Sequence, residues 1–138
     1  WTALMGDRRE TFAHRGNGGA VQRFYAPVRK VHLAKALTCR MHYFAANPLK
    51  DVLARLRRHQ SAETGASWEV PRDIPEEYLQ HLEGEHRIKK NGKWIWEQIG
   101  DRPQHLLDCE VMQVCAATML KILGQDALAE DSQVVEKK

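Results

Sequence analysis

One long apolar segment near the C-terminus, residues 105–123, constrains the fold more than any other part of the chain. It contains no Gly or Pro, and its apolar side chains leave little polar surface, which is typical of a helix packed on several sides. At about 100° per residue, Asp108 falls on the same side as Met112 and Cys115, whereas Glu110 points about 200° away from Asp108. The pattern therefore predicts a buried helix in which Asp108 faces inward and Glu110 faces outward.

A carboxylate near the start of such a helix has two explanations. Asp108 either complements the positive end of the helix macrodipole, which contributes about 0.3–1 kcal/mol and requires no catalysis, or it holds a divalent cation. Hard ions such as Mg²⁺ bind through one or two carboxylates together with phosphate oxygens of a substrate. The spacing alone leaves both explanations open.

Four blocks of the sequence, taken in order, resemble the C-terminal nuclease domain of lambda-type bacteriophage terminase large subunits. The blocks are residues 47–51, residues 74–82 with Glu85, residues 94–96, and residues 104–110. No single block is specific, but their order and spacing together carry the resemblance, which covers the chain from about residue 1 to residue 123.

The resemblance implies an α/β domain with an RNase H-like nuclease fold, a mixed sheet flanked by helices, over residues 1–124. It implies a metal-dependent endonuclease that cuts concatemeric viral DNA during packaging and uses Mg²⁺ or Mn²⁺. The implied partners are double-stranded DNA and, through the full-length protein, the terminase small subunit and the portal or procapsid, in the cytoplasm of a bacterial host. Residues 125–138 lack apolar periodicity and are expected to form a flexible tail.

Within this resemblance, Asp108 matches the family's acid on the last core helix. His105, one turn earlier, stands at a position that is acidic in some members and histidine in others; it either tunes the metal site, positions a water, or is a surface histidine. Asp108 and His105 are therefore the candidate catalytic residues, and Asp108 and Glu110 the candidate metal ligands. Glu85 and Glu110 are both candidates for the second acid, by proximity in sequence only.

The sequence departs from the family in two places. Family members carry a first catalytic Asp on the first core strand, upstream of the point where this chain begins, whereas residues 1–6 resemble a later core strand. We therefore expect a fragment that lacks this strand and its acid, although two-metal cleavage needs several converging carboxylates. Asn47 stands where some relatives carry Asp, and Asn47 followed by Pro48 is a common helix start, so capping is the favoured interpretation.

The distribution of charge is more informative than the formal net charge of +3. Residues 7–35 carry many Lys and Arg side chains but only two acids, and Lys89, Lys90 and Lys93 surround a predicted hairpin tip. Such clusters contact phosphates without sequence preference, yet a charge run is often only a solvated face. The candidate DNA-binding residues are Lys89, Lys90, Lys93 and Lys50, which lies on the outer side of a predicted helix.

Local patterns predict a mixed α and β structure. Strands are expected at residues 1–6, 20–33, 37–46 and 68–71, helices at 48–59 and 74–82, and a polar loop at 60–67. Asn91 and Gly92 predict a two-residue hairpin turn that pairs residues 87–89 with residues 94–96. Trp94 and Trp96 share one face of this hairpin, for which core packing is the favoured use.

Several classes of protein are disfavoured. The three cysteines are odd in number and lack CxxC spacing, which argues against structural zinc and for reduced, buried thiols in a cytoplasmic protein. No membrane-spanning apolar run or signal peptide is evident. The glycines of residues 16–19 lack the lysine of a phosphate-binding loop, so the motor ATPase of a terminase is not in this chain. The sequence contains no nucleophile elbow, so it does not indicate a serine or cysteine hydrolase.

Two functional hypotheses of different class remain. One is a metal-dependent DNA endonuclease domain of a phage or prophage terminase. The other is a catalytically inactive fragment or interaction domain of a decayed prophage terminase. An Asp on a strand immediately upstream of residue 1 in the parent gene would favour the enzyme.

Overall fold

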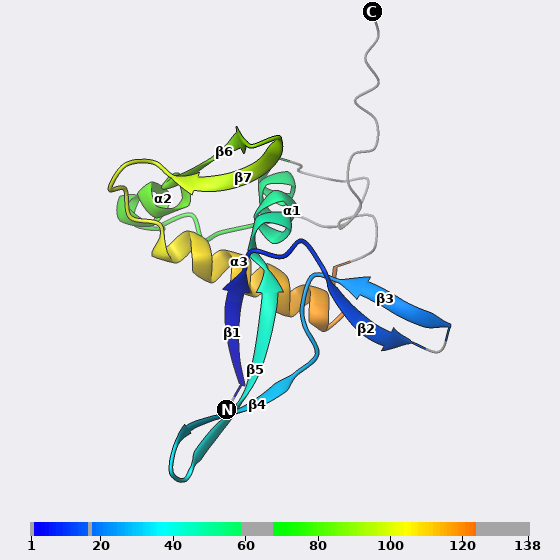
Figure 1. Ribbon diagram of the computed structural model, residues 1–138. Helices are drawn as coiled ribbons and strands as arrows, with labels where there is room; N and C mark the ends of the chain where they lie inside the picture. The colour runs from blue at the N-terminus through cyan, green and yellow to red at the C-terminus, as the bar shows by residue number, and fades with distance from the viewer. Residues whose placement is uncertain (1, 17, 59–67, 124–138) are drawn as a thin grey trace, which may run out of the picture.

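The computed structural model describes residues 2–16, 18–58 and 68–123, and Figure 1 shows their arrangement. The predicted loop at 60–67 and the predicted tail at 125–138 lie outside the described residues. The elements in chain order are β1 (Thr2–Asp7), β2 (Phe12–Gly16), β3 (Gly19–Arg23), β4 (Arg29–Ala34), β5 (Leu37–Ala45), α1 (Ala46–Arg58), α2 (Glu76–Leu82), β6 (Glu85–Lys90), β7 (Lys93–Gln98) and α3 (His105–Met119).

A three-stranded mixed sheet in the order β1-β5-β4 stands at the centre of the fold. β1 runs parallel to β5, from the pair Thr2 and Arg40 to the pair Asp7 and Ala45, and β4 runs antiparallel to β5. Parallel pairing requires the chain to leave the sheet and return, and the separate β2–β3 hairpin forms on the way. A mixed sheet with helices confirms the predicted α/β class, while the RNase H-like topology stays a prediction.

β5 leads directly into α1, and the core forms around this junction (Figure 1). The apolar residues of α1 recur at the spacing of one helix face, as predicted, and they pack against α3. A fully buried Leu or Val side chain contributes about 1.5–3 kcal/mol, so this cluster is the main stabilising part of the domain. Its buried members are Phe44, Leu49, Val52, Leu53, Leu56, Leu82, Leu107, Val111, Val114 and Cys115.

The structure confirms the hairpin predicted at Asn91 and Gly92. β6 and β7 pair antiparallel from Glu85 and Gln98 to Lys90 and Lys93, and Asn91 and Gly92 form the turn with φ of 51° and 77°. Both turn residues therefore have the positive φ that a type I′ hairpin turn requires. The hairpin lies over α1 at the opposite end of the molecule from the β4–β5 tip (Figure 1).

The expectation of one strand over residues 20–33 is wrong. β3 ends at Arg23 and β4 begins at Arg29; between them Tyr25 forms an isolated bridge with Phe44, and the Ala26 N–H donates to the Tyr43 carbonyl over 2.7 Å. Pro27 follows at once and has no N–H, so a continuous ladder cannot pass through it. The break separates the β2–β3 hairpin from the central sheet.

Two other expected boundaries differ from the structure. Residues 68–71 form no strand. α3 ends at Met119, four residues before the end of the apolar segment, because Lys121 adopts a left-handed φ of 57° and the Ile122 N–H closes on the Ala117 carbonyl at 2.9 Å. This closure is of the kind that ends many helices, although Gly is the usual residue at the left-handed position.

None of the helices in residues 2–16, 18–58 and 68–123 has the length and apolar character needed to cross a membrane.

Candidate active site

Asp108 lies at the edge of the buried face of α3. The buried residues of this helix are Leu107, Glu110, Val111, Val114 and Cys115, and the Asp108 side chain is 41% exposed. The expectation that Asp108 faces the core is therefore wrong: the buried stripe lies to one side of it. Asp108 instead points toward α1, where its Oδ1 atom lies 3.5 Å from Nζ of Lys50.

Lys50 belongs to a buried ion pair with Glu85. Its Nζ atom lies 2.8 Å from Oε1 and 2.7 Å from Oε2 of Glu85, and the two side chains are 11% and 5% exposed. The ammonium group therefore stands between two carboxylates, one from β6 and one from α3. This corrects the expectation that Lys50 lies on the outer side of its helix. Three elements distant in sequence, α1, β6 and α3, meet at Lys50.

Gly84 sets the distance between the start of β6 and the start of α3. A Cβ atom at this position would lie 2.2 Å from the Pro103 carbonyl oxygen and 2.9 Å from Cβ of Gln104. The Gly84 carbonyl accepts a hydrogen bond from Ile99 N–H at 2.8 Å. Only glycine permits this approach of two backbone segments, and it places Glu85 within reach of the residues that precede Asp108.

Glu110 points to the opposite side of α3 and is almost fully buried, which overturns the expectation that it faces water. Its carboxylate accepts a hydrogen bond from the Trp68 indole N–H at 2.9 Å and another from the Tyr78 hydroxyl. A buried carboxylate requires such partners. Since Asp108 and Glu110 are separated by about 200° around the helix, the carboxylate of Glu110 serves to hold Trp68 and α2 against α3. Its assignment as a metal ligand stays a prediction that this geometry does not support.

His105 is the first residue of α3 and is exposed, one turn before Asp108. Its ring lies 6.1 Å from the ring of His81, centroid to centroid, and it makes no hydrogen bond within the described residues. His81 is buried, and its Nδ1 atom accepts the Leu106 N–H at 3.3 Å. His81 therefore accepts a hydrogen bond from one of the free N–H groups at the start of the helix. Because this role is filled by His81, the ring of His105 remains available to a ligand.

The β6–β7 hairpin is fixed to α1 through one of its two tryptophans. The Trp96 indole N–H donates to Oδ1 of Asp51 at 2.9 Å, and its backbone N–H donates to Oδ1 of Asn47 at 3.1 Å. Asn47 lies inside the first turn of α1, so the expected capping role is wrong and its side chain holds the hairpin instead. Arg87 adds an ion pair of 2.8 Å to Asp51. Trp94 does not enter the core, because it is 54% exposed.

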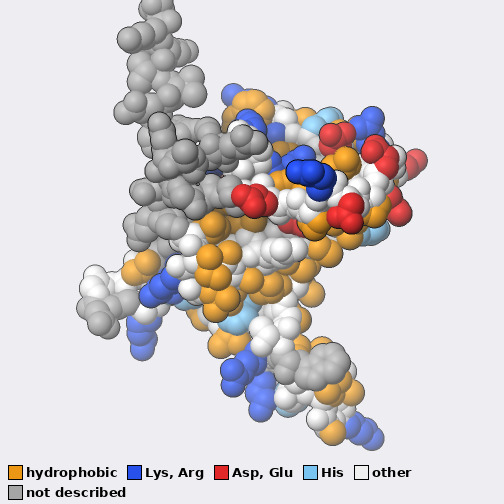
Figure 2. All heavy atoms as spheres, turned by 180° about the vertical axis from the view of Figure 1, so that it is seen from behind, with side chains coloured by type: hydrophobic (Ala, Val, Ile, Leu, Met, Phe, Trp, Pro, Cys, Tyr) orange, Lys and Arg blue, Asp and Glu red, His pale blue; other side chains and the backbone are white. Residues whose placement is uncertain are grey.

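The hairpin tip carries the three lysines proposed to bind DNA. Lys89, Lys90 and Lys93 are exposed, and Lys90 forms a 3.3 Å ion pair with Glu97. Figure 2 shows that this upper part of the molecule carries acidic and basic side chains together. Lys89 and Lys93 are therefore the tip cations without an ion pair among the described residues.

The cysteines lie on two faces of the fold. Cys39 and Cys115 are buried, as expected, whereas Cys109 is exposed, which corrects the expectation that all three thiols are buried. Cys109 and Cys115 thereby report which side of α3 faces the core.

Alkylation tests this orientation. Iodoacetamide at neutral pH should modify Cys109 in the folded protein while sparing Cys115, because the thiolate is the nucleophile and burial raises the pKa of Cys115 to about 11. Mass spectrometry of the digested protein identifies the modified residue, and the unfolded protein, in which every thiol reacts, is the control. Equal labelling of Cys109 and Cys115 in the folded protein would contradict the orientation of α3.

The carboxylates beside Lys50 offer the type of ligand that a divalent cation needs. Asp108 has no partner other than Lys50 within the described parts of the chain, and its oxygens and those of Glu85 are hard donors suited to Mg²⁺ or Mn²⁺. Within residues 2–16, 18–58 and 68–123, however, no three His, Cys, Asp or Glu side chains converge on one point. The donors fit such an ion only when substrate oxygens, water or further protein ligands complete its coordination.

Comparison with models of protein families gives a match over most of the chain. The model of a family described as "Terminase large subunit gpA, endonuclease domain" matches residues 4–127. Searches of curated proteins and of solved structures gave no match.

Proposed function

The chain belongs to the family of terminase large subunit gpA endonuclease domains, and from this premise we propose that it cuts DNA in a metal-dependent reaction centred on Asp108. The proposed substrate is concatemeric viral DNA, and the proposed setting is a phage or prophage packaging complex in the host cytoplasm. The terminase small subunit and the portal or procapsid are its proposed partners through the full-length protein.

One observation carries this proposal: a half-exposed carboxylate adjoins a buried ammonium group. The 3.5 Å contact between Asp108 and Lys50 lies where α1, β6 and α3 meet. A surface Asp that only complements a helix dipole needs no such neighbour. The arrangement instead combines a hard anionic ligand with a fixed positive charge, which are the two groups that phosphodiester chemistry uses.

The residues have distinct roles in this proposal. Asp108 would hold the cation, and Mg²⁺ or Mn²⁺ would supply charge stabilisation for the displacement at phosphorus. Lys50 directs its positive charge toward the scissile phosphate, and Glu85 fixes the position of that charge. His105, exposed one turn before Asp108, orients a water molecule or a phosphate oxygen at the same edge of α3. Lys89 and Lys93 contact the DNA backbone from the hairpin tip.

The proposal predicts that Asp108→Asn abolishes cleavage. Mn²⁺-dependent nicking of supercoiled plasmid should fall by more than about 100-fold, the upper end of what is lost when a residue that merely orients a metal ligand is removed. Asp101→Asn is the matched control, since Asp101 is an exposed acid in the turn before α3 and should retain the parent activity.

The assay is run on this chain and on a form lengthened at its N-terminus, because the resemblance expects a further acid upstream of residue 1. Cleavage by Asp108→Asn at the rate of the parent would refute the site. Loss of cleavage in Asp101→Asn as well would show that the effect is not specific to Asp108.

A second candidate is an interaction domain without catalysis. It is favoured by one observation, namely that the described residues bring no third metal-ligating side chain to Asp108 and Glu85. If both forms of the protein leave plasmid uncut in Mg²⁺ and in Mn²⁺, this second function replaces the first.

A further inference from the structure

A stretch of 40 residues, from position 11 to position 50, contains no Asp or Glu. It builds β2 to β5 and the start of α1. Figure 2 shows the result: on the face in view, the lower part of the molecule carries Lys and Arg side chains and no acidic ones. The cations of this stretch are Arg15, Arg23, Arg29, Lys30, Lys35, Arg40 and Lys50.

Two of these cations are direct neighbours in the central sheet. Lys30 on β4 is paired with Arg40 on β5, and Arg40 is paired on its other side with Thr2 of β1. Paired residues in adjacent strands point to the same face of a sheet, so these three side chains form a row across all three strands. We call it the Lys30–Arg40 row. Both of its cations are exposed.

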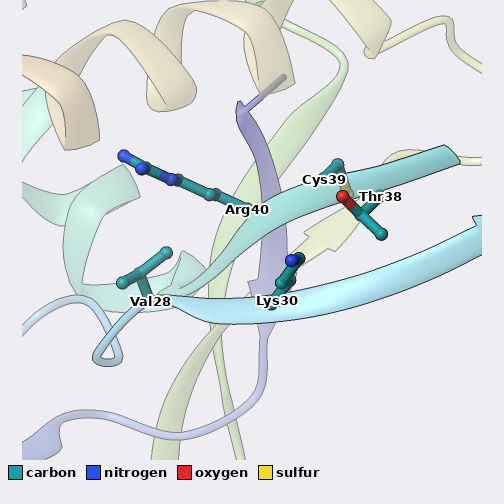
Figure 3. Close-up of a pocket in the computed structure, with 5 residues that line it drawn as sticks. All are labelled: Val28, Lys30, Thr38, Cys39 and Arg40. Carbon is teal, nitrogen blue, oxygen red and sulfur yellow. The ribbon is translucent and has the colours of Figure 1, made fainter.

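The row borders an open hollow of about 450 Å³ (Figure 3). Its lining residues are Val28, Lys30, Thr38, Cys39 and Arg40, and the figure shows Lys30 and Arg40 leaving neighbouring strands at this hollow. Thr38 adds a hydroxyl group on the β5 side. Two cations with hydroxyl groups beside them are a donor set for phosphate oxygens.

Like charges placed directly opposite one another weaken a sheet. Lys90 and Lys93 also stand opposite one another in the β6–β7 hairpin, but there Glu97 forms an ion pair with Lys90. Lys50 is paired with Glu85, Arg87 with Asp51, and Lys90 with Glu97. In the part of the chain that the structure describes, neither Lys30 nor Arg40 has an acidic partner. The Lys30–Arg40 row is therefore a site where an external anion relieves repulsion within the protein.

We propose that the Lys30–Arg40 row binds the phosphate backbone of duplex DNA at a distance from the cut. This inference rests on the proposed function. Arg40 lies five residues before the end of β5, which corresponds to about 17 Å of strand, and α1 with Lys50 begins directly after it. One DNA strand places a phosphate about every 3.4 Å of helix axis, so this length of strand corresponds to about five nucleotides between the row and the scissile phosphate. Such contacts position the duplex without reading its sequence.

Binding measurements on the full chain test the row. The variant K30Q/R40Q and the control R72Q/R102Q each remove two positive charges; Arg72 and Arg102 are exposed residues in loops next to α2 and α3. Fluorescence anisotropy with a 40-base-pair duplex, in EDTA and at several salt concentrations, gives the affinity and its salt dependence. K30Q/R40Q should reduce the slope of log K against log salt by about 2, since each lost phosphate contact removes about 0.9.

The control variant should lower that slope by less than half as much, and K30Q/R40Q should unfold at the same temperature as the parent or at a higher one, because repulsion is removed. Equal effects of the two variants would overturn the proposal in favour of simple net charge. An unchanged slope in K30Q/R40Q would also overturn it, and would leave an acidic protein surface as the partner of the row. The binding assay contains no metal and measures no cleavage. A negative result for the Lys30–Arg40 row can therefore be distinguished from a negative result in the Asp108 cleavage test.

Discussion

Lys50→Met is expected to destabilise the domain by about 3–5 kcal/mol, because it leaves the carboxylate of Glu85 buried without its counter-ion. The Glu85 side chain is 5% exposed and both of its oxygens bind the Lys50 ammonium group. Met keeps most of the volume of Lys, so the effect reports the lost charge and not a cavity. Urea denaturation followed by circular dichroism measures the change in the free energy of unfolding.

The control for this experiment is Lys90→Met. Lys90 and Glu97 form an ion pair of 3.3 Å, but their side chains are 58% and 44% exposed, and an exposed pair contributes at most about 1 kcal/mol. The double variant Lys50→Met/Glu85→Met should recover most of the stability, since a buried ion pair replaced by apolar groups is often neutral. Equal losses in Lys50→Met and Lys90→Met would show that the Lys50–Glu85 pair is not buried as described.

Gly84→Ala should be comparably damaging, although it adds a single methyl group. The new Cβ atom would lie 2.2 Å from the backbone oxygen of Pro103, and a backbone atom cannot rotate away as a side chain can. Overpacking of this kind costs about 1–3 kcal/mol and occasionally more; here we expect about 3 kcal/mol, with Glu85 displaced from Lys50 as the chain relaxes. Thermal unfolding and the plasmid assay measure the two consequences.

Gly18→Ala is the matched control for that variant. A Cβ atom at Gly18 meets nothing within 4 Å, and no positive φ makes the substitution strained. It should change the unfolding temperature little and leave cleavage intact. If Gly84→Ala is as stable and as active as Gly18→Ala, the close approach of β6 to the segment before α3 is not required for the site.

Signals confined to a few neighbouring residues predicted local structure well. Asn91 and Gly92 identified the β6–β7 turn, and the spacing of Leu49, Val52 and Leu53 identified α1 and its buried face. In both cases the sequence pattern arises from the backbone or from one helix face, so nothing distant is needed to interpret it.

The orientation of α3 could not be obtained in the same way. Its apolar residues surround the helix, so periodicity does not distinguish the inner face from the outer one. Glu110 becomes an inner residue because Trp68 and Tyr78, 42 and 32 residues away, donate hydrogen bonds to it. Trp68 packs against the same buried cluster, and residues 68–71 do not form the strand predicted for them.

In the candidate site, too, local patterns identified one residue and missed the contacts made by distant ones. Asp108 was identified through a motif, but the pairing of Lys50 with Glu85 joins residues 35 positions apart and leaves no mark in either local pattern. Lys50 looked like one more basic residue on an amphipathic helix. Only the meeting of α1 with β6 shows that its charge is buried and directed at two carboxylates.

The parallel pairing of β1 with β5 has a consequence for how the protein is made. Thr2 pairs with Arg40, so the partner of β1 is synthesised 38 residues later. At about 5–20 residues per second on the ribosome, this delay lasts about 2–8 s. Throughout that interval the nascent β1 strand, with Leu4 and Met5 in its middle, has both of its edges open, and it is then that one chain can pair wrongly with another.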